Sequence, residues 1–223
     1  MIFLFCDEAG KDVLHVKGEL HRYIVKVRRH QVGDEIAFRN KTDIKQLCIY
    51  KIVDISPKKV EFELLERKEV VVKSEKNLHV AWCVIDTKSI EKVLPTLNEI
   101  GVAKISFIYC DRSQRNIKLD FKRFERILEA SMQQCGRSEF MEFDVYDNIK
   151  DFIAKYPDTK VFDFCDNVLN KDVDIKRFLV GCEGGFSQAE KEFLSKQERF
   201  RLDTPMVLRS ESAVISIVSL SLV

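Results

Sequence analysis

The hydrophobic and polar positions of the first 67 residues follow a mainly β pattern. Apolar residues alternate with polar ones, or form β-branched runs, over residues 35–39, 45–55 and 59–65. Turn residues separate these runs, which predicts a small barrel or curled sheet. The apolar start, residues 1–6, predicts a first strand, and apolar residues at helical spacing predict an amphipathic helix over residues 19–29.

Beyond residue 77 the pattern changes to strands that alternate with helices. Such alternation predicts a parallel sheet covered by helices on both faces. Residues 66–77 are charged at both ends and show little amphipathic order, which is typical of a linker. We therefore predict two domains, residues 1–72 and residues 73–223. Strands are predicted at residues 78–85, 104–109, 139–145, 160–164 and 178–180, and helices at residues 89–100, 120–135, 149–156 and 211–223.

A glycine-rich turn follows the last predicted strand. The segment FLVGCEGGFSQAE, residues 178–190, places Gly181, Gly184 and Gly185 within five residues. Ser187 and Glu190 have the spacing of a capping box, so the predicted order is strand, glycine turn, helix. Free backbone N–H groups at such a turn can hold a polar ligand. Many strand-to-helix turns bind nothing, however, and this pattern alone leaves both interpretations open.

Composition narrows the function classes without naming one. Lys and Arg total 37 against 36 acidic residues, so a nucleic-acid site has to be a local basic patch. The seven cysteines form no C-x-x-C pair, and no apolar run reaches the length of a membrane span. These features indicate a cytoplasmic protein with free thiols and no membrane association. The four histidines lack metal-ligand spacing, so we expect no metal. For His79 and Trp82, packing within the predicted strand is the favoured role.

Six segments resemble one family, and they occur in that family's order along the chain. LVGCEGGFSQAE is similar to the family's (I/L)GPEGGFS..E motif, and VLRSESA, residues 207–213, is similar to ILRTETA. NEIGV, DRSQR, ERILEASMQQCGR and HRYIVKVRRHQVGD match further segments of the family. Together the six segments resemble the RsmE family of 16S ribosomal RNA uracil-N3 methyltransferases, which belongs to the SPOUT superfamily.

The resemblance implies a fold, a cofactor and partners. It implies a PUA-like N-terminal β-barrel that helps to hold RNA, and an α/β domain with a parallel sheet whose C-terminal part forms a trefoil knot. Loops of the knot would hold S-adenosylmethionine, and two subunits would pack as a homodimer that acts on 16S rRNA in the small ribosomal subunit. The cofactor-binding positions carried over are Phe164, Cys165, Val180, Gly181, Gly184, Gly185, Met206, Val207, Leu208 and Ser210.

Methylation of uracil N3 requires loss of a proton, which leaves negative charge that an arginine can stabilise. Arg209, beside the implied cofactor loop, is the first candidate for this catalytic role, and a salt bridge to Glu183 or Glu211 is an equally good interpretation. Glu183 and Glu211 are candidates to accept the proton, or else they order the turn and the start of the last helix. The arginines predicted to contact RNA phosphates are Arg29, Arg112, Arg115, Arg123 and Arg137.

Four positions depart from the family pattern. Cys182 replaces a proline, Ser210 and Ser212 replace threonines, and Thr204 stands where glycine is common. The serines keep a hydroxyl group, whereas Cys182 and Thr204 predict cofactor loops that are looser or differently shaped. Two alternatives remain: a SPOUT ribose 2'-O-methyltransferase, disfavoured because the last helix opens with Ser-Glu-Ser-Ala, and an RNA-binding module that has lost catalysis.

Overall fold

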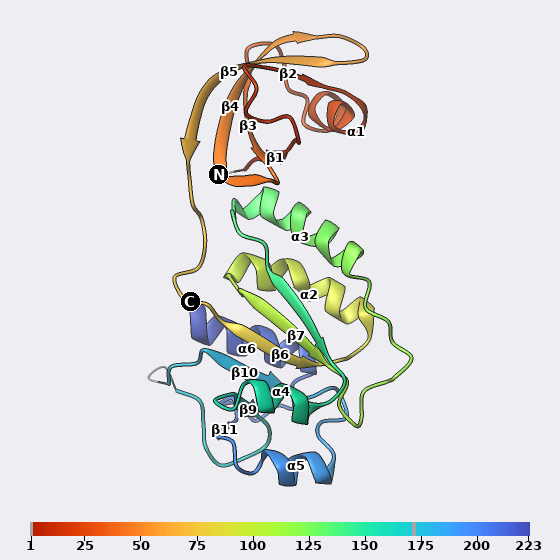
Figure 1. Ribbon diagram of the computed structural model, residues 1–223, viewed down its shortest axis with the longest axis vertical. Helices are drawn as coiled ribbons and strands as arrows, with labels where there is room; N and C mark the ends of the chain where they lie inside the picture. Colours follow the sequence, from red (N-terminus) through yellow and green to blue (C-terminus); the bar gives the residue numbers. More distant parts are fainter. Residues whose placement is uncertain (1, 171–172) are drawn as a thin grey trace. The chain divides into compact units, whose positions relative to one another are not determined.

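The computed structural model describes residues 2–170 and 173–223, and the chain forms two compact units (Figure 1). The first unit contains Met1–Lys73 together with Met132–Glu139, and the second contains Ser74–Ser131 together with Phe140–Val223. The sequence predicts a division between residues 72 and 73, and it does not predict that the segment 132–139 groups with the N-terminal residues. Within the described ranges, no helix is long and apolar enough to cross a membrane.

The described part of the first unit is a curled sheet of five strands in the order β1-β3-β4-β5-β2. All pairs except β1 with β3 are antiparallel, and interruptions of the register in β3–β4 and β4–β5 are the irregularities that bend a sheet. Its core holds Phe38, Tyr50 and Phe62 in edge-to-face contact. The strands are β1 (Leu4–Phe5), β2 (Val13–Val16), β3 (Glu35–Asn40), β4 (Asp43–Ile55) and β5 (Val60–Glu69).

Two predictions for this unit need correction. The predicted N-terminal strand is only Leu4–Phe5, and β2 was not predicted, because its four residues are too short to show a clear pattern. The predicted helix is α1 (Gly18–Arg22) followed by one π-helical turn, η1 (Tyr23–Val27). It ends earlier than predicted, and Arg29 just beyond it has a left-handed φ of 57°, which a right-handed helix cannot contain.

The second unit contains a parallel sheet, as predicted. Among the described residues it has six strands in the order β11-β9-β10-β6-β7-β8, and every pair is parallel. All five residues of β6 are buried, which requires cover on both faces. Helices α2 and α6 pack side by side (Figure 1). The strands are β6 (His79–Cys83), β7 (Lys104–Ile108), β8 (Glu142–Tyr146), β9 (Lys160–Phe162), β10 (Arg177–Val180) and β11 (Arg199–Phe200), and the helices are α2 (Thr87–Ile100), α3 (Phe121–Cys135), α4 (Ile149–Lys155), α5 (Gln188–Leu194) and α6 (Ser210–Leu222).

Local signals explain where several of these helices begin and end. The carboxylate of Asp86 caps α2 by accepting a hydrogen bond from the backbone of Ser89. The helix ends at Gly101, whose φ of 108° is a conformation that glycine adopts without strain. Helix α2 continues through Pro95, so this proline does not start a new helix; the kink that the sequence also allows there stays a prediction.

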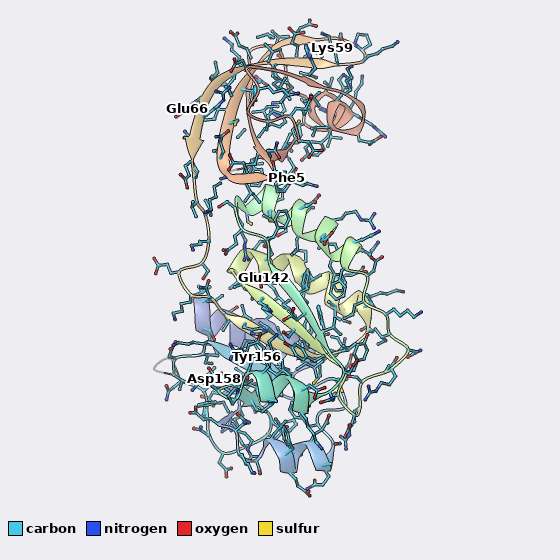
Figure 2. The ribbon with its side chains drawn as sticks, viewed as in Figure 1. Phe5, Lys59, Glu66, Glu142, Tyr156 and Asp158 are labelled. Carbon is cyan, nitrogen blue, oxygen red and sulfur yellow. The ribbon has the colours of Figure 1, made fainter. Side chains whose placement is uncertain are left out.

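His79 lies at the amino end of β6 and is buried, as predicted. Its Nδ1 accepts a hydrogen bond from Arg177 Nε at 2.9 Å, and its Nε2 lies 2.8 Å from Ser106 Oγ. Burial, followed by the positive charge of Arg177, lowers the pKa of His79 to about 3. Arg177 is held in turn by Asp158 at 2.6 Å and lies 4.0 Å over the ring of Tyr156; Figure 2 labels both partners. The imidazole is therefore neutral at neutral pH and serves packing.

Candidate functional site

The glycine turn leaves the carboxyl end of β10 and leads into α5. Gly185 has a left-handed φ of 65°, and its N–H donates to the carbonyl of Cys182 at 2.9 Å. A Cβ atom on Gly181 would lie 3.3 Å from the Cα of Gly185, so the backbone closes tightly on itself here. The predicted capping box is confirmed: Ser187 Oγ accepts from Glu190 N–H, and Glu190 Oε2 accepts from Ser187 N–H.

The loop after β7 holds this turn from outside. The N–H of Asp111 donates to Glu190 Oε1 at 2.8 Å, and Ser187 Oγ donates to the Asp111 carboxylate at 2.5 Å. Arg112 Nη1 donates to the carbonyl of Gly184 at 2.5 Å. Glu190 thus caps its own helix and also binds the neighbouring loop, which gives the turn a defined position at the carboxyl edge of the sheet.

The start of α6 joins the same turn from inside. Ser210 Oγ donates to the carbonyl of Gly181 at 2.6 Å and accepts a hydrogen bond from Trp82 Nε1 at 2.8 Å. Trp82, on β6, is fully buried, as predicted, and Ser210 is 6% exposed. The hydroxyl of Ser210 is therefore occupied within the protein. It links β6, the glycine turn and α6, and this contribution to the site is positional.

Two further loops at this edge carry predicted cofactor positions. The loop after β9 pairs with the segment after β11, because Arg201 N–H donates to Asn167 O and Leu169 N–H donates to Arg201 O, both at 2.8 Å. Leu208 and Cys165 are half-buried, and Val180 is buried. Phe164, Met206 and Val207 are 74%, 70% and 79% exposed. Large apolar side chains so exposed near a tight backbone turn are features of a ligand-binding edge.

The predicted catalytic residues lie next to this junction. Arg209 is the exposed N-cap residue of α6. Glu211 lies in the first turn of that helix, where its negative charge interacts favourably with the positive end of the helix dipole. Glu183 is exposed within the glycine turn. Arg209 is exposed, and in the described part of the chain no ion pair joins its guanidinium to Glu183 or Glu211, so the structure does not favour the salt-bridge interpretation over the catalytic one.

Three of the five arginines predicted to bind RNA have other partners. Arg112 holds the glycine turn, as described above, and Arg123 Nε pairs with Glu91 at 2.6 Å. Arg137 is only 4% exposed, with Glu139 Oε2 at 3.9 Å, and burial lowers its pKa. The prediction for Arg137 needs correction, because a buried guanidinium does not present itself to a phosphate. Arg29 and Arg115 are exposed.

Sequence reasoning missed the contribution of sulfur atoms to the site. Cys110, directly after β7, and Cys182, in the glycine turn, have their Sγ atoms 3.6 Å apart. Cys83, at the end of β6, is fully buried, and burial raises the pKa of its thiol. The hydrogen bond to Cys110, together with burial, also raises the pKa of Cys182. No spacing rule could have found this cluster, because its members come from three separate segments. Asp111 was quoted only as part of DRSQR, and its bonds to Ser187 and Glu190 could not be predicted because those residues are distant in the chain.

Comparison with known proteins identifies the class to which this fold and site belong. Residues 72–222 match the RNA methyltransferase domain family. Over 225 residues the chain is 36% identical to ribosomal RNA small subunit methyltransferase E of Helicobacter pylori, covering 99% of each protein. It is 26% identical to the protein of the same name from Aquifex aeolicus, covering 98% of this chain and 97% of that protein. The chain therefore belongs to the ribosomal RNA small subunit methyltransferase E family.

Solved structures show the same fold. A methyltransferase from Legionella pneumophila in complex with S-adenosylmethionine matches 99% of this chain and 95% of its own, with a TM-score of 0.77 and 21% identity. The ribosomal RNA small subunit methyltransferase E of Neisseria gonorrhoeae, bound to S-adenosylmethionine, matches 98% of this chain and 95% of its own, with a TM-score of 0.76 and 16% identity. The combination of a curled N-terminal sheet and a parallel sheet is thus shared with this family.

Proposed function

We propose that this protein is an S-adenosylmethionine-dependent methyltransferase that methylates N3 of a specific uridine in the 16S rRNA of the small ribosomal subunit. Membership of the family over the full chain supports the reaction class. The observation that carries the proposal is the junction in which Ser210 joins the glycine turn to α6 through the carbonyl of Gly181. It brings the two segments that resemble cofactor-binding motifs to one edge of the sheet.

The residues at this edge fit S-adenosylmethionine. A Cβ atom on Gly185 would meet nothing within 4 Å, so the backbone there leaves room for close approach of a ligand, and the exposed apolar side chains nearby suit the faces of an adenine ring. Backbone groups of this turn and of Met206 to Ser210 would read the edge of the adenine. When bound, the cofactor supplies an electrophilic methyl group on its sulfonium.

The chain's own residues would prepare the uracil. The base has to be unpaired so that N3 faces the methyl donor. Arg209 is exposed, and its guanidinium would stabilise the negative charge that develops on the uracil. Glu183 and Glu211 lie on either side of the junction, where one of them would take the N3 proton directly or through water. The other would order the turn or the helix start.

We also propose the knot, the RNA-binding module and the homodimer that the family likeness implies. The C-terminal segment would thread as a trefoil knot, and the strand order with β10 between β9 and β6 is compatible with that. The curled N-terminal sheet would act as a PUA-like module that holds RNA. Half-buried small residues on α6, Ala213, Ser216 and Ser219, would allow close packing of two subunits in a homodimer. The reducing cytoplasm, where this reaction would occur, suits the seven free cysteines.

RNA phosphates would be held by a small set of arginines. Arg29 and Arg115 are exposed, and the Nη1 of Arg115 donates to the carbonyl of Asp147 at 3.3 Å, which leaves further donors on its guanidinium. Phosphate contacts position a nucleic acid without reading its sequence, so affinity should fall as salt rises. The small set agrees with the net charge of +1.

A transfer assay tests the proposal. Small ribosomal subunits that lack the modification are incubated with the protein and S-adenosylmethionine carrying a labelled methyl group, and the labelled nucleoside is then identified. We expect label on N3 of one uridine, and label on a ribose would support the 2'-O-methyltransferase alternative and overturn the proposal. Arg209→Lys keeps the charge and Arg209→Ala removes it, so a stabilising role predicts much slower transfer by the alanine variant. If calorimetry shows no binding of S-adenosylmethionine, the chain is an RNA-binding module.

A further inference from the structure

Three cysteines meet where three strands of the parallel sheet end. Cys83 is the last residue of β6, Cys110 follows β7, and Cys182 follows β10 in the glycine turn. All three thiols are buried. The Sγ atoms of Cys110 and Cys182 are 3.6 Å apart, and burial, followed by the neighbouring thiol of Cys110, raises the pKa of Cys83. All are free thiols, and no step of the proposed methyl transfer uses them.

The pairing depends on Cys182. The family motif that the turn resembles has a proline where this sequence has Cys182, and proline provides no sulfur. The thiol of Cys182 also lies 3.6 Å from the carbonyl of Gly185, so it is part of the turn's own hydrogen bonding. The neighbouring thiols of Cys182 and Cys83 lower the pKa of Cys110, because they favour its thiolate.

We propose that Cys110 and Cys182 form an oxidation site at which a peroxide converts the two thiols into a disulfide that ties the glycine turn to the loop after β7. The observation that supports this proposal is the 3.6 Å distance between the Sγ atoms of Cys110 and Cys182, which come from two different segments. The consequence for the cofactor rests on the proposed function, in which this turn holds S-adenosylmethionine. The disulfide itself does not depend on that function.

The chemistry balances in two steps. The Cys110 thiolate attacks one oxygen of hydrogen peroxide, the O–O bond breaks, and the released hydroxide takes a proton to become water. The sulfur is now a sulfenic acid. The Cys182 sulfur then attacks the Cys110 sulfur, the S–S bond forms as the S–O bond breaks, and a second water leaves. Overall the two thiols lose two protons and two electrons, and the peroxide is reduced to two waters.

Formation of the disulfide draws the glycine turn and the loop after β7 together. A disulfide holds its sulfur atoms about 2.05 Å apart, so the two Sγ atoms approach each other from their present separation of 3.6 Å. Cys182 shares the turn with Gly181 and Gly185, whose backbones already pack tightly together. The contact of its Sγ with Gly185 O is lost when that sulfur turns toward Cys110. A turn displaced in this way presents its backbone groups less well to the cofactor.

The test uses the full-length reduced protein treated with hydrogen peroxide. Free thiols are alkylated before digestion, and mass spectrometry looks for the peptide that joins Cys110 to Cys182. Calorimetry measures S-adenosylmethionine affinity before oxidation, after oxidation, and after reduction with dithiothreitol. We expect the cross-linked peptide, a loss of affinity of about tenfold or more, which is a readily measured change, and recovery on reduction.

Matched variants separate the possible causes. Whatever their own affinity in the reduced state, Cys182→Ser and Cys110→Ser should each show no change in cofactor affinity on treatment with peroxide, whereas Cys6→Ser, in the first unit, should respond like the original protein. Absence of the cross-linked peptide, or an equal loss of affinity in Cys182→Ser, overturns the inference. A cross-link without any loss of affinity overturns the regulatory consequence. Failure of the reduced protein to bind S-adenosylmethionine contradicts the proposed function instead, and the mass spectrum still decides whether the disulfide forms.

Discussion

The substitution Ser210→Ala tests the junction that holds the candidate site together. The hydroxyl of Ser210 accepts from Trp82 Nε1 at 2.8 Å and donates to Gly181 O at 2.6 Å. Alanine removes one oxygen atom and keeps the helix, so the steric change is small. The N–H of Trp82 and the carbonyl of Gly181 both lose this partner at buried positions.

The expected cost follows from these two groups. A buried polar group left without a partner costs about 1–3 kcal/mol. For two such groups we expect a total loss of about 2–4 kcal/mol in the free energy of unfolding. The affinity for S-adenosylmethionine should also fall, because the carbonyl of Gly181 is no longer held in place. The losses of stability and of cofactor affinity thus share one cause, the missing hydrogen bond from Ser210 Oγ to the carbonyl of Gly181.

The assay is urea denaturation followed by tryptophan fluorescence. Trp82 is the single tryptophan of the chain, so the signal reports on the residue that loses its partner, and the midpoint gives the stability change if the slope is constant. Ser212→Ala is the control, because Ser212 is exposed in the first turn of the same helix and its side chain has no hydrogen bond within the described residues. The control should shift stability by less than about 0.5 kcal/mol. Equal midpoints for the two variants would refute the argument.

Three further predictions address the fold and the turn. His79 has a pKa lowered to about 3 from 6.5, so its contribution to stability is complete above pH 6.5 and is lost as the pH falls toward 3. Each pKa unit is worth about 1.4 kcal/mol, so the original protein should lose about 2 kcal/mol more than His79→Gln between pH 6.5 and about pH 5 in urea titrations. Gly101→Ala should lose more thermal stability than Gly33→Ala: both glycines have positive φ, but only at Gly101 does a new Cβ come within 2.8 Å of Ser74. Cys182→Pro, which restores the family's residue, should preserve or tighten the affinity for S-adenosylmethionine in calorimetry.

Each of these predictions has an outcome that contradicts it. Parallel pH profiles for the original protein and His79→Gln would mean that the buried imidazole is not the group that titrates. Equal melting temperatures for the two glycine variants would show that the side chain of Ser74 moves aside without cost. A large loss of affinity in Cys182→Pro would mean that this turn does not hold the cofactor as proposed.

The features predicted well from sequence are those decided by a few neighbouring residues. Ser187 and Glu190 cap α5 as their spacing indicates, since each bonds the other's backbone within one turn of helix. Alternating strands and helices predicted the parallel sheet, and an apolar strand context predicted the burial of Trp82. By contrast, the four residues of β2 and the two residues of β11 are too few for any periodicity to reveal.

The arginines show where such reasoning stops. Arg112, Arg123 and Arg137 were grouped by charge and by likeness to a family, and in the sequence they cannot be told apart from Arg29 and Arg115. The folded chain separates them, because it supplies a carbonyl, a carboxylate and a buried environment to the first three. Whether a positive charge is free to meet a phosphate depends on neighbours that are distant in the chain.

The sequence by itself therefore determined the succession of elements, the glycine turn and its capped helix, and the family to which the chain is similar. Tertiary structure alone decided that the hydroxyl of Ser210 forms hydrogen bonds with Gly181 and Trp82, and that Cys110 and Cys182 lie in contact. The physical reason is range. Helix caps and turns minimise a local free energy over a few residues, whereas the order of strands and the partners of buried groups are set by the packing of the whole unit.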